Sequence, residues 1–143
     1  MVISVLFVSL LIELLKMEVD MEMDFLTNKV IGCAIEVHRQ LGPGLLESSY
    51  ERCLMYELAL AGLDAKAQVL LPIHYKGMSI EAGYRIDILF PDKLVLELKA
   101  VDKLLPIHTA QLITYLKLSG VKTGLIINFN VNKLTNGLKR VVL

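Results

Sequence analysis

Asp87, Glu97 and Lys99 have the residue types and the spacing of a metal site with an ammonium group beside it. They lie in residues 83–99, GYRIDILFPDKLVLELK, where two runs rich in Ile, Leu and Val flank a Pro-Asp-Lys turn at 91–93. This pattern predicts a β-hairpin. Because side chains alternate along a strand, Glu97 and Lys99 share one face of the second run.

The turn length sets the pairing of the two strands. A three-residue loop pairs Phe90 with Leu94 and places Asp87 directly across from Glu97, with Cβ atoms about 4.5–5.5 Å apart. Two facing carboxylates are unfavourable unless a cation lies between them, and oxygen ligands suit Mg²⁺ or Mn²⁺. The hairpin therefore indicates a metal site; a solvated polar face is the alternative interpretation.

Alternation also assigns the remaining side chains of the hairpin to its two faces. One face of the first strand is predicted to hold Tyr84, Ile86, Ile88 and Phe90, and the other Arg85, Asp87 and Leu89. In the second strand the apolar set is Leu94, Leu96, Leu98 and Ala100, opposite Val95, Glu97 and Lys99.

Two helices are predicted ahead of the hairpin. Apolar residues recur at helical spacing from Asp24 to Leu41, and Gly42-Pro43-Gly44 then breaks the helix. A second helix follows and ends at Gly62. Within it Glu47 and Tyr50 are three residues apart on one face, in the pattern GxxExxY. A carboxylate in the first turn also suits the helix dipole, which is the alternative role for Glu47.

The remaining elements complete a layered α/β order. Residues 65–75 read as a strand with an edge or bulge at Pro72, and a Lys-Gly turn leads into a strand over 78–90. A helix is expected over 107–118 and a doubly covered strand over 123–129, with a short edge strand closing the tail. The order ααβββαβ predicts a three-layer sandwich with a central mixed sheet.

Several polar residues outside the hairpin are candidates for supporting roles. Gln111 and Tyr115 are four apart on one helix face, as a substrate-contacting pair or as a buried pair bracing the sheet. His108 is a weaker candidate for substrate contact. His38 is expected in the core and His74 on the surface.

Composition bounds the class of protein. The chain has 143 residues, zero net charge and a mean hydropathy of +0.57, which fits one domain with a real core. Residues 1–64 carry four Lys/Arg against ten Asp/Glu, and residues 65–143 carry eleven against five, so the half with the hairpin is the basic one. Cys33 and Cys53 lack zinc or disulfide spacing, which predicts buried free thiols in a reducing cytoplasm.

Residues 1–22 form an apolar extension and residues 23–143 the working domain. The run MVISVLFVSLLIELL has no preceding Lys or Arg, is too short to span a bilayer and is interrupted by Glu13, so neither a signal peptide nor membrane insertion is expected. The extension is interpreted as a wrongly assigned translation start or an accessory segment. A helix that docks on a second copy, giving a homodimer, is the alternative.

Four motifs in order resemble one known family. They are Gly44-x-x-Glu47-x-x-Tyr50, Tyr84-x-x-Asp87, Glu97-x-Lys99 and Gln111-x-x-x-Tyr115. Together they resemble the GxxExxY protein family of the PD-(D/E)XK nuclease superfamily, from about Asp24 to the C-terminus. The Pro-Asp pair of the superfamily name is here Ile86-Asp87, and Pro91-Asp92 is a decoy in the turn.

The resemblance implies a restriction-endonuclease-like core and a role for each motif residue. Asp87 and Glu97 would hold Mg²⁺ or Mn²⁺ with the backbone carbonyl of Leu98, and Glu47 would complete or orient the shell. Lys99 would position the attacking water and stabilise the transition state. Tyr50, Gln111 and Tyr115 would contact the substrate or brace the site.

The implied function is a metal-dependent nuclease acting on DNA or RNA in the cytoplasm. Such chemistry needs a nucleophile and neutralisation of charge on the phosphoryl oxygens, and a bound divalent ion with a lysine supplies both. A non-catalytic nucleic-acid-binding module and an oligomerising module on the same fold are the alternatives. The choice between DNA and RNA is not readable from the sequence.

Overall fold

The computed structural model describes residues 4–143. Its helices are α1 (Val5–Leu41), α2 (Glu47–Leu60) and α3 (Pro106–Ser119), with a 3-10 turn η1 (Leu134–Gly137). Its strands are β1 (Lys66–Leu70), β2 (Ile73–Tyr75), β3 (Met78–Ile80), β4 (Arg85–Phe90), β5 (Leu94–Lys99), β6 (Thr123–Asn128) and β7 (Leu138–Val142).

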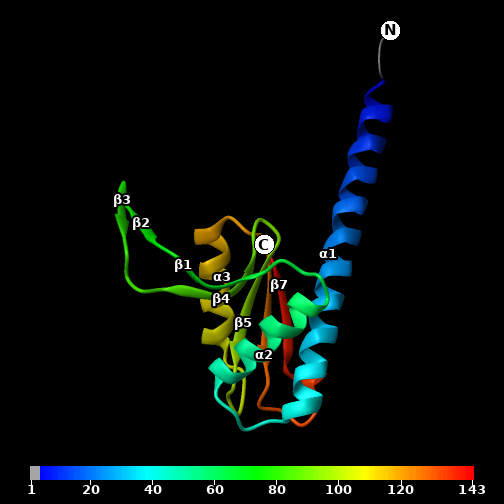
Figure 1. The fold of residues 1–143 in the computed structure, drawn as a ribbon. Helices are drawn as coiled ribbons and strands as arrows, with labels where there is room; N and C mark the ends of the chain where they lie inside the picture. The colour runs from blue at the N-terminus through cyan, green and yellow to red at the C-terminus, as the bar shows by residue number, and fades with distance from the viewer. Residues whose placement is uncertain (1–3) are drawn as a thin grey trace.

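Five strands form one mixed sheet in the order β1-β4-β5-β6-β7. Only the β5–β6 pair is parallel, because α3 carries the chain back across the sheet between these two strands. Helices α1 and α2 cover one face and α3 the other (Figure 1). The predicted three-layer α/β fold with a mixed central sheet is confirmed.

Each face of the sheet has its own apolar core. Residues of α1 and α2 pack on one face in a cluster that includes Tyr50, Leu54, Leu96 and Phe129. Helix α3 packs on the other, where Leu112 meets Val95 and Ile126. Gly124 lets α3 approach closely, because a Cβ there would lie 2.7 Å from the Leu112 side chain. Strand β5 is buried on both faces from Leu94 to Leu98, and its last residue, Lys99, is half-buried.

The predicted hairpin is present, with Phe90 paired to Leu94. The predicted faces are wrong at one point. Ile86 and Ile88 were predicted on one face, but Ile88 packs in the cluster under α1 and α2 and Ile86 in the cluster under α3. The strand therefore changes face between these residues, at Asp87. Its partner strand is distorted at the same level, since Gln68 has φ +54°.

The two long strands predicted before the hairpin are each interrupted. The first divides into β1 and β2 around Leu71-Pro72, and the second into β3 and β4. Strands β2 and β3 pair only with each other and project from the sheet as a separate arm, which we define as residues 71–84 (Figure 1). Pro72 lacks the N–H that would continue a ladder, which explains the break.

Helix α1 is longer than the predicted helix, which began at Asp24. It starts at Val5, capped by the Ser4 hydroxyl, and continues without a break into the core. Its first part projects beyond the sheet (Figure 1), and Leu6, Phe7 and Leu15 are 52–82% exposed. Residues 1–3 of the predicted extension lie outside the described residues. Within residues 4–143, no helix combines the length and the apolar character that crossing a bilayer requires.

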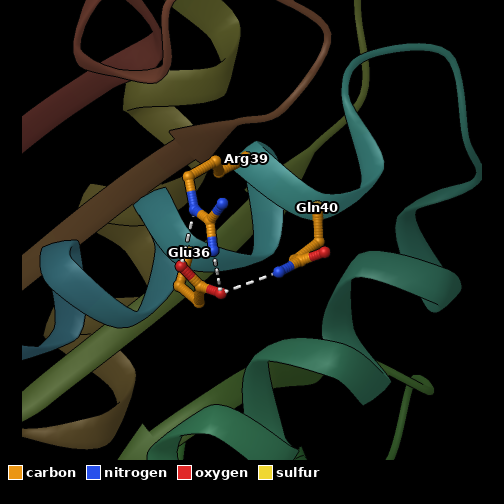
Figure 2. Close-up of polar contacts among 3 residues, drawn as sticks. All are labelled: Glu36, Arg39 and Gln40. Atoms are coloured by element: carbon orange, nitrogen blue, oxygen red, sulfur yellow. Dashed lines mark hydrogen bonds and ion pairs between the residues drawn. The ribbon is translucent and has the colours of Figure 1, made fainter.

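The other end of α1 is held by a local polar cluster. Arg39 donates from Nε and Nη2 to the two carboxylate oxygens of Glu36 at 2.9 Å, and Gln40 donates to the same group at 3.1 Å (Figure 2). These groups face solvent, so we expect the cluster to contribute little to the free energy of unfolding. The chain then reverses at Gly42, whose φ is +66°.

Candidate functional site

Asp87 and Glu97 are bridged by hydrogen bonds through the backbone. The Leu98 N–H donates to Asp87 Oδ2 at 2.8 Å, and the Asp87 N–H donates to Glu97 Oε1 at 3.4 Å. The β4–β5 pairs end at Ile88 and Leu96, so these side-chain contacts take over where the regular pairing stops. The structure thus brings the two predicted acids together, from neighbouring strands.

Asp87 opens into a cleft of about 520 Å³ between the start of α2 and strands β1, β4 and β5. Glu47 and Glu51 line it from α2, together with Gln68 from β1 and Leu98 from β5. The change of face in β4 explains this position, since strict alternation would have put Asp87 on the side of α3. Glu97 is not a lining residue; it is buried, with 4% of its surface exposed.

Burial and the charges of neighbouring carboxylates keep both acids from ionising easily. Burial, then the charge of Asp87, raises the pKa of Glu97 from 4.5 to about 8. Burial and the charges of Glu51 and Glu47 raise the pKa of Asp87, although its bond from Leu98 acts the other way. At neutral pH Glu97 therefore keeps its proton, and the ionised form of Asp87 is disfavoured.

A chain of hydrogen bonds runs from Lys99 onto α3. The Lys99 ammonium donates to Gln111 Oε1 at 3.2 Å, and Gln111 Nε2 donates to the Tyr115 hydroxyl at 3.0 Å. The charge of Lys99 also favours ionisation of Asp87 and Glu97, so it lies within electrostatic reach of both. Gln111 and Tyr115 therefore hold the ammonium group in position, and the ring of Tyr84 packs edge-on against Tyr115 with centroids 6.5 Å apart.

Tyr50 supports the loop before α2 and does not face the cleft. It is fully buried, stacks on Phe129 with centroids 4.4 Å apart, donates to the Gly42 carbonyl at 2.6 Å and accepts from the Leu45 N–H at 3.2 Å. Gly44 has φ +100°, which other residues rarely adopt, so the loop can turn around this hydroxyl. Of the two predicted roles, the contacts of Tyr50 are those of a bracing residue.

Three residues of the site were not predicted: Glu51, Gln68 and Asn128. Glu51 lies four positions after Glu47 and accepts from Gln68 at 2.9 and 3.0 Å. Its spacing on the helix was a usable signal. Asn128 is 2% exposed and clamps the segment after Lys99, since its side chain bonds both the N–H and the carbonyl of Val101. A polar residue at the end of a buried apolar strand was the signal there.

Other candidates have structural roles. The His108 ring accepts from the Leu105 N–H at 3.0 Å and caps α3, so the predicted substrate contact has no support. His38 is buried, bonded to the Val131 carbonyl at 2.7 Å, and His74 is exposed; both predictions are confirmed. Cys33 and Cys53 are unpaired as predicted, but each is only partly buried.

The donor set suits a divalent cation, but no complete ligand cluster is preformed. Across residues 4–143, no three His, Cys, Asp or Glu side chains lie close enough together to form one. The acids that could begin such a cluster are Asp87 and Glu97, which are joined by a hydrogen bond, and Glu47, which lines the same cleft as Asp87. Carboxylates whose ionisation is opposed by burial and by neighbouring carboxylates are groups that a divalent cation would stabilise, so the residues fit such an ion.

A family model described as the PD-(D/E)XK nuclease superfamily matches residues 24–141. The chain belongs to the PD-(D/E)XK nuclease superfamily. Neither the curated proteins nor the solved structures contain a significant match. The superfamily match spans the sheet, α2 and α3, together with α1 from Asp24. The restriction-endonuclease-like fold predicted from the motifs is therefore confirmed.

For a PD-(D/E)XK protein with these acids, we predict that stability without metal falls as the pH rises from about 5 to 8. Folded Glu97 keeps its proton up to about pH 8, whereas the unfolded chain releases it near 4.5. Proton release in this window therefore favours unfolding, by about 2–4 kcal/mol in total. Urea unfolding in EDTA at several pH values measures the effect.

Glu97→Gln is the control for this pH dependence. It removes the titrating group, so the free energy of unfolding should vary less between pH 5 and 8 than in the wild type. Mg²⁺ added at pH 8 should raise the wild-type midpoint. A wild-type stability that is flat or rises across this window would contradict the assignment.

Proposed function

We propose that this protein is a nuclease of the GxxExxY type that hydrolyses phosphodiester bonds with Mg²⁺ or Mn²⁺. The observation that carries the proposal is the pairing of Asp87 with Glu97 at the edge of an acidic cleft, with Lys99 within electrostatic reach of both. Gly44, Glu47 and Tyr50 support the subfamily, since they form the loop and helix start that border the same cleft.

The proposed ligands of the ion are Asp87, Glu97 and the Leu98 carbonyl, with Glu47 completing or orienting the shell. When bound, the ion would acidify a water molecule and neutralise charge on a phosphoryl oxygen. Lys99 would stabilise the negative charge of the transition state and orient the water, and Gln111 would hold its ammonium group at the site. Glu51 would keep Gln68 against the wall of the cleft.

The direct test is cleavage of labelled nucleic acids. Purified protein should cut at least one of single-stranded DNA, duplex DNA, single-stranded RNA or duplex RNA in Mg²⁺ or Mn²⁺, and EDTA should stop the reaction. Binding without cleavage of any of them would favour the alternative of a non-catalytic nucleic-acid-binding module. The cytoplasm remains our proposed location, which the two unpaired cysteines support.

A second proposal concerns the domain boundary and self-association. We take residues 23–143 as the folding unit, since Thr27 and Val30 are the first buried residues of α1. The part of α1 before them exposes many large apolar side chains, among them Leu6, Phe7 and Leu15, and exposed apolar patches often mark interaction sites. We predict that the full chain forms homodimers or larger species in sedimentation experiments and that a chain starting at Met23 is folded and monomeric. A monomeric full chain would contradict this.

A further inference from the structure

The arm of residues 71–84 has one apolar face and one polar face. Ile73 pairs with Ile80 and Tyr75 with Met78, and directly opposed residues share a face, so these four side chains form one apolar row. His74 and Ser79 pair on the other face. Tyr75, Met78 and Ile80 are 55%, 57% and 40% exposed. A two-stranded hairpin is only marginally stable by itself, so we expect a binding partner to cover its exposed apolar row.

The arm has a regular tight turn at its tip and a backbone hydrogen bond at its base. Lys76 and Gly77 have φ +46° and +79°, as the tight two-residue hairpin turn requires, and the Lys76 ammonium lies 5.5 Å from the centre of the Tyr75 ring. At the base the Leu71 N–H donates to the Tyr84 carbonyl at 2.8 Å. Tyr84 then contacts Tyr115, which belongs to the hydrogen-bond chain of Lys99. The arm is thus continuous with the candidate site.

Charge indicates what the arm would hold. The cleft presents the carboxylates of Glu47, Glu51 and Asp87, which repel a phosphate backbone, so affinity for a polyanion must come from outside the cleft. The arm itself holds one cationic residue, Lys76 at the tip, and one acidic residue, Glu81, and the exposed Arg85 follows directly after its base. An exposed aromatic ring in an apolar row, with a lysine at the tip and an arginine beside the base, matches a charged backbone that carries unstacked bases.

We propose that the β2–β3 arm binds single-stranded nucleic acid, with bases on the Tyr75–Met78 face and the backbone near Lys76 and Arg85. The proposal rests on the proposed function, since it names the substrate class of the same site. Unpaired bases expose the apolar faces that this row can cover, whereas a duplex hides them. The arm therefore favours a single strand over a duplex of the same sequence.

The test is fluorescence anisotropy with the full chain in EDTA, using a labelled single-stranded oligonucleotide and its blunt duplex. Tyr75→Ala should raise the Kd for the single strand about 5- to 50-fold, and Tyr75→Phe should leave it within about twofold. Tyr56→Ala is the matched control, because Tyr56 is 66% exposed on α2 and lines a different cleft. Its Kd should match the wild type.

The possible outcomes distinguish nucleic-acid binding by the arm from nuclease activity at the site. The proposal is overturned if the wild type binds no single strand, if duplex binds as tightly, if Tyr75→Ala has no effect, or if Tyr56→Ala weakens binding equally. Absence of cleavage in Mg²⁺ with the expected Kd pattern would refute the nuclease activity and leave the arm intact. Normal cleavage of a single strand with a Kd insensitive to Tyr75→Ala would refute the arm alone.

Discussion

Asp87→Asn is expected to lower the rate of nucleic-acid cleavage at least about 1,000-fold, a loss of about 4 kcal/mol of transition-state stabilisation. The amide removes one negative oxygen ligand from the centre of the proposed metal site, although it still offers an oxygen to the Leu98 N–H, so the hairpin should stay folded. Initial rates on a labelled oligonucleotide at saturating Mg²⁺ measure the effect. Thermal unfolding in EDTA checks that the variant is folded.

Asp92→Asn is the matched control for this prediction. Asp92 belongs to the Pro-Asp pair that imitates the superfamily motif but lies in the turn, exposed, with φ +63°, a conformation that Asn also adopts. Its cleavage rate should equal that of the wild type. A rate for Asp87→Asn within about threefold of wild type, or an equal loss in Asp92→Asn, would show that the acid was assigned wrongly.

Lys99→Ala is expected to reduce kcat about 100- to 1,000-fold with a smaller change in KM. The side chain is half-buried and held toward Gln111, so its charge acts at a fixed place where negative charge develops in the reaction. Steady-state kinetics separate the two constants. Lys103→Ala is the control, because Lys103 is exposed in the loop after β5.

A role in substrate binding alone would give a different kinetic result. If Lys99 only attracted the polyanion, Lys99→Ala would raise KM and leave kcat near the wild-type value, and high salt would reproduce the defect. If Lys103→Ala lost as much activity as Lys99→Ala, the effect would come from general surface charge.

Local sequence rules were sufficient for the pairing of Asp87 with Glu97. The turn at 91–93 sets the register of the two strands, so the closeness of the two acids could be predicted without the structure, whereas the face on which Asp87 lies could not. The position of Gln111 and Tyr115 also followed from helix spacing. These features depend on contacts close in sequence or on one simple hairpin.

Other features depended on contacts that no local pattern contains. Asp87 faces the cleft because β4 changes face beside Gln68, whose positive φ belongs to a different strand. The depth of Glu97 results from packing of the sheet against α3, so neither its burial nor its raised pKa was visible in an E-x-K pattern. The role of Tyr50 required knowing that the Gly42–Leu45 loop folds over its hydroxyl.

The central claim is that Asp87, Glu97 and Glu47 converge on one divalent ion, and anomalous diffraction from Mn²⁺-soaked crystals tests it most directly. The account predicts a single strong peak bonded to carboxylate oxygens of Asp87 and Glu97, with Glu47 turned toward it across the cleft. The absence of a peak at this position at saturating Mn²⁺, with Glu97 still buried away from the cleft, would contradict it.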